Sequence, residues 1–301
     1  MSRFVGYKNG NYTVLFDTRT GTKIRQNELD KLIPEFPECF DYKITNCCKH
    51  NCPECHENSK PNGIHGSIMR DKFIDTLHPY TEIAIGGGNP LEHPELEMFL
   101  HKCKDLSLIC NITVHQDDFI ANKAQLKEWV DDHLLFGVGV SIHNVTPDLI
   151  KGLKEFPNAV LHVIAGLVTM DQLKELAGNN FKILILGYKT FRRGEKLFYT
   201  HTDLIVDRTN ELRKKLKTIL KEGWFETISF DNLAIEQLHV RCLMTEKEWA
   251  EFYMGDDGQF TLFIDSVEQT FTTGSTSKDR YPIMDNIKDM FTMVRQLNQV
   301  D

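Results

Sequence analysis

Four of the eight cysteines of this 301-residue chain lie in one short stretch, CCKHNCPECH at residues 47–56, together with two histidines. Thiolate and imidazole groups at this density indicate metal binding, because soft sulfur ligands select zinc and iron–sulfur clusters. Cys48, Cys52 and Cys55 have the spacing C-x3-C-x2-C. Three thiolates on one tight loop can hold three irons of a [4Fe-4S] cluster, and the fourth iron would then lack a protein ligand.

The same cysteines and histidines could instead form a tetrahedral zinc site. Zinc sites usually draw on a second ligand pair, and none is evident downstream. Cys103 and Cys110 are seven residues apart and Cys242 is isolated, so each is expected to pack as a small hydrophobic side chain. The spacing favours the cluster, and a zinc-stabilised binding module without catalytic activity is the alternative.

The elements that must position this stretch alternate between strands and helices. Strands are predicted at residues 40–45, 82–86, 110–115, 137–143, 159–166, 182–188 and 227–231. Between them, apolar residues recur at helical spacing, Thr146-Pro147 is typical of a helix start, and Gly178 and Gly223 are typical of helix ends. Repeated strand–helix units predict an α/β fold with parallel strands. Because no G-x-G-x-x-G follows the first strand, a closed or partly closed barrel is favoured over an open doubly wound sheet.

The cysteine stretch directly follows the first predicted strand, and a glycine-rich turn at residues 86–90, GGGNP, follows the second. This combination resembles the radical S-adenosylmethionine (SAM) superfamily. The resemblance implies a partial (β/α)6 TIM-like barrel, a [4Fe-4S] cluster on Cys48, Cys52 and Cys55, and SAM bound to the open iron. It also implies reductive cleavage of SAM to a 5′-deoxyadenosyl radical that abstracts hydrogen from a substrate, and sensitivity to oxygen.

The resemblance further implies which residues contact SAM. The glycine-rich turn is usually GGEP in the family and meets the methionine end of SAM; here Asn89 stands where glutamate is common. The fifth strand resembles the pattern G-x-I-x-G-x-x-E, from which His162 and Thr169 depart. For Asn144, helix capping is an alternative. The expected SAM contacts are Gly86, Gly87, Gly88, Asn89, Pro90, Ser141, His143, Asn144, Ile164, Gly166, Gly187 and Tyr188.

Charged and polar residues after the sixth and seventh strands should face the mouth of the barrel and orient the substrate. Lys189, Asp231 and Asn232 are the expected catalytic residues, although any one of them could be a solvated loop residue. The substrate is expected to be a small molecule, a nucleotide or a short peptide. The resemblance implies an electron donor such as flavodoxin or ferredoxin, and it leaves open whether the reaction is that of an oxidoreductase, a transferase or a lyase.

Composition and charge narrow the class of protein. The net charge is −8 and no basic run exceeds the three residues Arg213-Lys214-Lys215, so extended nucleic-acid binding is not expected. No apolar stretch reaches the roughly 20 residues of a membrane span, and no signal-peptide pattern opens the chain, so a cytoplasmic protein is expected.

Three regions are expected along the chain. Residues 1–38 form a β-rich extension with a hairpin, residues 39–232 form the barrel, and residues 233–301 form a C-terminal extension that could cover the barrel. The last region contains an expected β pair at residues 259–265 and 267–273 and an amphipathic helix from Ile287 to Leu297.

Overall fold

The computed structural model describes residues 3–28 and 31–297. Its first element is a three-stranded antiparallel sheet of β1 (Phe4–Asn9), β2 (Tyr12–Asp17) and β3 (Lys23–Gln26). The predicted hairpin is present, and Gly10 at its turn has a φ of 60°, a conformation that glycine adopts without strain. The apolar side of this sheet packs with Phe36, Ile109 and Phe260 of the main body of the protein.

The main sheet contains all seven strands that the apolar pattern predicted. They are parallel and pair in chain order. Their bounds are β4 (Cys39–Thr45), β5 (Glu82–Gly87), β6 (Ile109–His115), β7 (Gly137–Ser141), β8 (Ala159–Ile164), β9 (Lys182–Leu186) and β10 (Thr227–Phe230).

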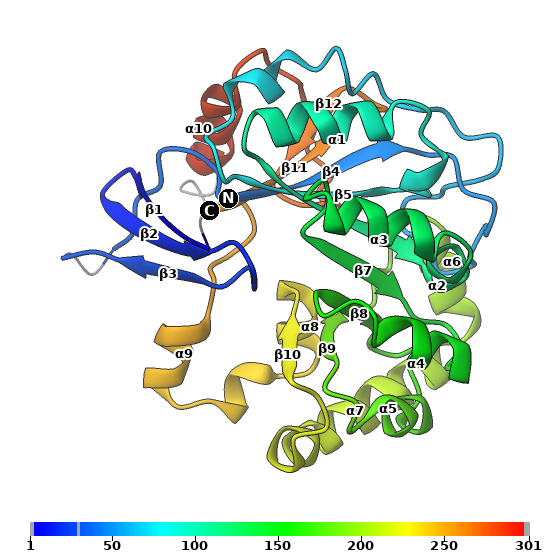
Figure 1. Cartoon of the computed structure of the whole chain (residues 1–301). Coiled ribbons are helices and arrows are strands. Elements are labelled where there is room, and N and C mark those ends of the chain that lie inside the picture. Colours follow the sequence, from blue (N-terminus) through cyan, green and yellow to red (C-terminus); the bar gives the residue numbers. More distant parts are fainter. Residues whose placement is uncertain (1–2, 29–30, 298–301) are drawn as a thin grey trace.

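Three further strands extend this sheet beyond β4. β11 (Thr261–Asp265) pairs with β4 in parallel, and β12 (Thr270–Thr272) and β13 (Tyr281–Pro282) continue antiparallel. The sheet is therefore mixed. It curves (Figure 1) but does not close within the described ranges, where β10 and β13 are its edge strands. The α/β class and the C-terminal hairpin are confirmed, and a closed barrel is absent from the part of the chain that is described.

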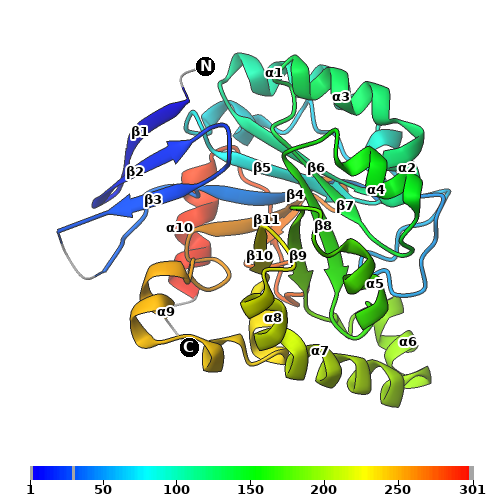
Figure 2. The ribbon, with the colours of Figure 1, turned by 60° about the horizontal axis from the view of Figure 1, so that its bottom comes forward.

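Helices cover the convex face of the sheet (Figure 2). Alternate strand residues such as Phe40, Tyr42 and Ile44 point to this face and are fully buried. The expected caps are present: the Thr146 hydroxyl accepts a hydrogen bond from the amide of Leu149 and starts α4, and Gly223 ends α7 in the left-handed conformation. The helices are α1 (Leu96–Asp105), α2 (Gln116–Ala121), α3 (Lys123–Asp131), α4 (Pro147–Leu153), α5 (Met170–Leu176), α6 (Arg193–Thr200), α7 (Thr202–Glu222), α8 (Asn232–Gln237), α9 (Glu246–Phe252) and α10 (Ile287–Leu297), with short 3-10 turns η1 (Lys72–Thr76), η2 (Pro90–Glu92) and η3 (Val240–Leu243).

The final helix packs as its pattern predicted, because Ile287, Met290, Phe291 and Val294 are all fully buried in the main core. Across the described ranges, no helix combines the length and the apolar character that crossing a bilayer requires.

Candidate active site

The concave face of the main sheet encloses a cavity of about 660 Å³. Inward-facing strand residues such as Ala84, Thr113, Gly139 and Ser141 are small or polar, so they do not fill the interior as a packed apolar core would. A Cβ on Gly139 would lie 2.6 Å from the ring of His162. The loop that carries the clustered cysteines lies over the carboxyl ends of the strands and forms part of the cavity wall.

Cys48, Cys52 and Cys55 all line this cavity, and each is half-buried and free of a disulfide. The backbone amides of His50 and Asn51 donate hydrogen bonds to the sulfur of Cys48, and the amide of Cys55 donates to the carbonyl of Cys52 over 3.2 Å. Burial raises the pKa of Cys52 to about 12 and that of Cys48 above its ordinary value, and neighbouring thiols add to both shifts. The three cysteines that have the C-x3-C-x2-C spacing thus all line one cavity with their thiols unpaired.

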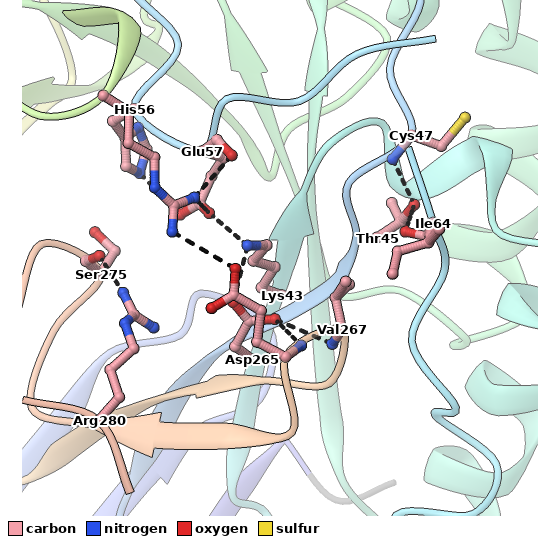
Figure 3. Close-up of polar contacts among 12 residues, drawn as sticks. Lys43, Thr45, Cys47, His56, Glu57, Ile64, Asp265, Val267, Ser275 and Arg280 are labelled. Carbon is pink, nitrogen blue, oxygen red and sulfur yellow. Dashed lines mark hydrogen bonds and ion pairs between the residues drawn. The ribbon is translucent and has the colours of Figure 1, made fainter. Parts of the chain in front are cut away.

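Cys47 is set apart from these three. Its thiol donates to the carboxylate of Glu92 over 2.9 Å, which raises the pKa of Cys47 to about 11. Its backbone amide is held by the hydroxyl of Thr45 at 2.9 Å (Figure 3). Cys47 therefore anchors the start of the loop, while the three cysteines that follow the C-x3-C-x2-C spacing border the cavity.

The glycine-rich turn after β5 packs directly against this anchor. The amide of Gly88 donates to the carbonyl of Thr45 over 2.6 Å, and the amide of Asn89 donates to the carbonyl of Cys47 over 2.7 Å. A Cβ on Gly88 would lie 2.1 Å from the Cys47 carbonyl oxygen, whereas a Cβ on Gly86 would meet nothing within 4 Å. The absence of a side chain at Gly88 thus serves the contact between two loops, and Gly86 leaves open space.

Gly86, Gly87 and Gly88 line the cavity, whereas Asn89 and Pro90 do not. The side chain of Asn89 is buried: its oxygen accepts from the amide of Leu91 and its nitrogen donates to Glu92. Asn89 therefore shapes the turn from behind.

Three histidines from three different elements stack beside the cysteines. The rings of His50 and His115 are 3.7 Å apart, and those of His115 and His143 are 4.5 Å apart. Burial and the two neighbouring imidazoles lower the pKa of His115 to about 4. Ligand atoms of Cys52, His115 and His143 lie within 4.8 Å of one another. Sequence reasoning missed His115, although it ends the third strand at the same sheet edge that His143 follows.

A second cavity of about 440 Å³ adjoins the first and shares Ser141, His143, His162 and Ile164 with it. Thr169, Gln172 and Arg208 complete its polar wall. The structure thus brings together Ser141, His143 and Ile164, three of the residues expected to contact SAM.

Four other expected SAM contacts have different surroundings. Gly187 and Tyr188 line the first cavity, and the hydroxyl of Tyr188 donates to the carbonyl of Gly194. Asn144 and Gly166 line neither cavity. Gly166 has a φ of 85° and turns the chain where a Cβ would lie 2.7 Å from Ile205. The amide of Asn144 donates to the side chain of Gln116 over 2.9 Å.

The three expected catalytic residues are not together. Lys189 lines the cavity, where its ammonium donates to the hydroxyl of Ser275 over 2.9 Å and lies 3.5 Å from His56. Asp231 caps α8, and one carboxylate oxygen accepts from the amides of Ala234 and Gly187.

Asn232 donates from its side chain to Gly255 and Asp257. Asp231 and Asn232 line neither cavity. Through these hydrogen bonds, their side chains hold the surrounding backbone in place.

A buried ion network lies under the cysteine loop (Figure 3). Lys43 on β4 contacts Glu57 at 3.0 Å and Asp265 at 2.8 Å, and Arg192 lies 3.6 Å from Glu57. Burial opposes ionisation of Glu57, but His56 and Lys43 beside it hold the pKa of this carboxyl well below its usual range. The network joins β4, the cysteine loop, the segment after β9 and the end of β11. Sequence reasoning did not find it.

This curved α/β sheet, with clustered cysteines and a glycine-rich turn at its carboxyl edge, is an arrangement that solved structures of other proteins also have. SuiB of Streptococcus suis shares the fold. SuiB bound to the precursor peptide SuiA superposes with a TM-score of 0.65 at 12% sequence identity, covering 96% of this chain and 87% of that chain. SuiB bound to S-adenosylmethionine superposes with a TM-score of 0.61 at 13% identity, covering 97% and 87%. No protein-family model and no curated protein sequence matches the chain.

Proposed function

We propose that the protein is a radical SAM enzyme that modifies a peptide. The observation that carries this proposal is that Cys48, Cys52 and Cys55 all line one cavity, in a fold shared with SuiB. Residues 39–232 would form the partial (β/α)6 barrel, with extensions at residues 1–38 and 233–301.

The residues present fit a [4Fe-4S] cluster with an open iron. The loop offers three sulfurs, and backbone amides already donate to one of them, as amides do around cluster sulfurs. When bound, the cluster and SAM would supply a 5′-deoxyadenosyl radical that abstracts hydrogen. Cys48, Cys52 and Cys55 would hold the cluster, and Cys47 would fix the start of the loop.

SAM would occupy the space that joins the two cavities. Gly86 leaves room for a ligand beside its backbone, and Ser141 and His143 offer polar groups to both cavities. We propose Gly86, Gly87, Gly88, Ser141, His143, Ile164, Gly187 and Tyr188 as contacts. Asn89, Pro90, Asn144 and Gly166 would support these residues, and Asp231 would orient the backbone of Gly187 through its hydrogen bond.

One observation favours a peptide as the substrate class, and the size of the first cavity is compatible with it. SuiB, which has the same fold, has been solved with a precursor peptide. The first cavity, at about 660 Å³, has the size of a small-molecule or side-chain pocket. Lys189 would meet the substrate from the cavity wall. An electron donor such as flavodoxin or ferredoxin remains a prediction.

Anaerobic reconstitution tests the proposal. The wild-type protein should take up about four irons and four sulfides per chain. After reduction it should release 5′-deoxyadenosine from SAM, and a variant with Cys48, Cys52 and Cys55 all changed to alanine should do neither. A wild-type protein that takes up zinc and no iron would instead support the zinc-stabilised binding module.

A further inference from the structure

The carboxylate of Asp41 lies in the first cavity without a partner. Asp41 is at the middle of β4 and points to the concave face, where it lines the cavity and is exposed to it. Its strand neighbours are Ala84 on β5 and Phe263 on β11, neither of which has a polar side-chain group. Among residues 3–28 and 31–297, no side chain or backbone group makes a hydrogen bond or ion pair with this carboxylate.

The other carboxylates that line this cavity are all paired. Glu57 contacts Lys43 at 3.0 Å, Glu82 contacts Lys23 at 2.6 Å, and Glu54 lies 3.4 Å from the ring of His143. An ionised group held in a protein interior is unfavourable unless a partner compensates it. Among the carboxylates of the described residues that line this cavity, Asp41 is therefore the one without an ion pair. A bound ligand would have to supply the cation that pairs with it.

The electrostatic surroundings of Asp41 also favour a cation. Burial raises the pKa of Asp41 to about 6; the Lys189 ammonium opposes this shift, and the carboxylates of Asp257, Glu57 and Asp231 reinforce it. At neutral pH the group is ionised, and three acidic neighbours outnumber one basic neighbour.

The two nearby cations have partners already. Lys43, the next inward-facing residue of β4, is neutralised by Glu57 and Asp265 (Figure 3), and Lys189 is held by Ser275. Lys189 keeps its charge and acts on Asp41 only through space, and neither cation forms an ion pair with Asp41.

The position of Asp41 along the strand sets the shape of the ligand. Thr45, where β4 ends and the cysteine loop begins, is four positions after Asp41, which corresponds to roughly 13 Å at about 3.3 Å per residue. The wall around it carries apolar groups, among them Ala84, Phe263 and Leu184. A ligand group that binds at Asp41 would therefore contact apolar groups along its stem and carry a positive charge at its end.

We propose that Asp41 is a specificity residue that binds the ammonium or guanidinium group of a lysine or arginine side chain of the substrate. This inference rests on the proposed function only for the peptide origin of that side chain. The cation would take the place of the missing partner, and the aliphatic stem would contact the apolar wall.

Binding of capped amino acids to the full-length reconstituted protein tests this inference without turnover. Isothermal titration at pH 7.5 would compare N-acetyl-lysine methylamide with N-acetyl-norleucine methylamide, which lacks the ammonium group. We expect the lysine probe to bind at least tenfold more tightly to the wild type. In Asp41→Asn this preference should vanish, and in Asp207→Asn, which removes an exposed carboxylate of α7, it should persist.

Equal affinities in the wild type, or an undiminished preference in Asp41→Asn, would overturn the inference. A preference for free 1,5-diaminopentane over the lysine probe would overturn the peptide origin. Should Asp41→Asn fold poorly, the wild type alone provides the test, because the preference must fall between pH 7.5 and pH 5 as Asp41 is protonated. If the wild-type protein does not cleave SAM but still prefers the lysine probe, the proposed function is refuted and this inference stands.

Discussion

The ammonium nitrogen of Lys43 lies 2.8 Å from a carboxylate oxygen of Asp265, a residue 222 positions further along the chain. The two side chains are 1% and 0% exposed. Lys43 precedes the cysteine loop by a few residues, and Asp265 ends β11, the strand that pairs with β4. The base of the proposed cluster loop is therefore fixed by a charge from the C-terminal part of the protein.

Lys43→Met should lower the free energy of unfolding by about 3–5 kcal/mol, because it leaves Asp265 buried without its cation. The double variant Lys43→Met/Asp265→Leu should recover part of this loss, since it removes the buried charge of Asp265 and leaves Glu57 with Arg192 and His56 beside it. Denaturant titration measures both. Lys72→Met is the matched control: it breaks a 2.9 Å pair with Asp285 whose side chains are 71% and 77% exposed, and it should cost less than about 1 kcal/mol.

Cys48→Ala, Cys52→Ala and Cys55→Ala should each lose the iron–sulfur chromophore and SAM cleavage, because two thiolates do not retain the cluster. Cys47→Ala should keep about four irons per chain, since its thiol bonds to Glu92 and lies outside the cavity wall. Iron analysis after anaerobic reconstitution checks all four variants. Loss of iron in Cys47→Ala with retention in Cys48→Ala would show that the ligand assignment is shifted by one residue.

Gly88→Ala should destabilise the protein by about 1–3 kcal/mol, as overpacking does, because its Cβ would meet the Cys47 carbonyl at 2.1 Å. It should also reduce iron retention, since the start of the cysteine loop must move. Gly86→Ala has open space and should change stability by less than about 0.5 kcal/mol. Thermal melts distinguish the two, and a Gly86→Ala variant that binds SAM more weakly at wild-type stability would support the proposed contact.

Asp41→Asn should be more stable than the wild type at neutral pH. The pKa of Asp41 is raised from 3.8 to about 6 in the folded protein, so the folded state binds this proton more tightly than the unfolded state. The stability that the protonated form provides is present near pH 4 and is lost as the pH rises through about 6. The difference in melting temperature between variant and wild type should therefore be small at pH 4, increase up to about pH 7 and then level off. A difference that decreases with rising pH would contradict the assignment.

Most strands could be predicted from the sequence because their residues are local and patterned. Phe40, Tyr42 and Ile44 alternate with inward-facing residues along β4. The cysteine loop begins directly after the last residue of this strand. The loop and the glycine-rich turn could be placed at one sheet edge because parallel strands end together. The contact between Gly88 and Cys47 gives that placement its physical reason.

The remaining features depend on contacts between distant segments. The pairing of β11 with β4 joins residues more than 200 positions apart, and no local pattern announces it. Asp231 follows an apolar strand just as a catalytic carboxylate would, but one of its oxygens caps α8 and accepts from the amide of Gly187. The stack of His50, His115 and His143 comes from three elements, and only a three-dimensional arrangement unites them.

The parallel pairing of β4 with β11 has a consequence for biosynthesis. Until a ribosome has translated through Asp265, nascent β4 has one edge unpaired and Lys43 lacks one of its two buried counter-ions. The helices and strands up to β10 precede β11 in the chain and can assemble before that moment. The pairing of β4 with β11 and the ion pair of Lys43 with Asp265, which support the cysteine loop, cannot. The proposed cluster loop therefore gains its full support only after residue 265 has been synthesised.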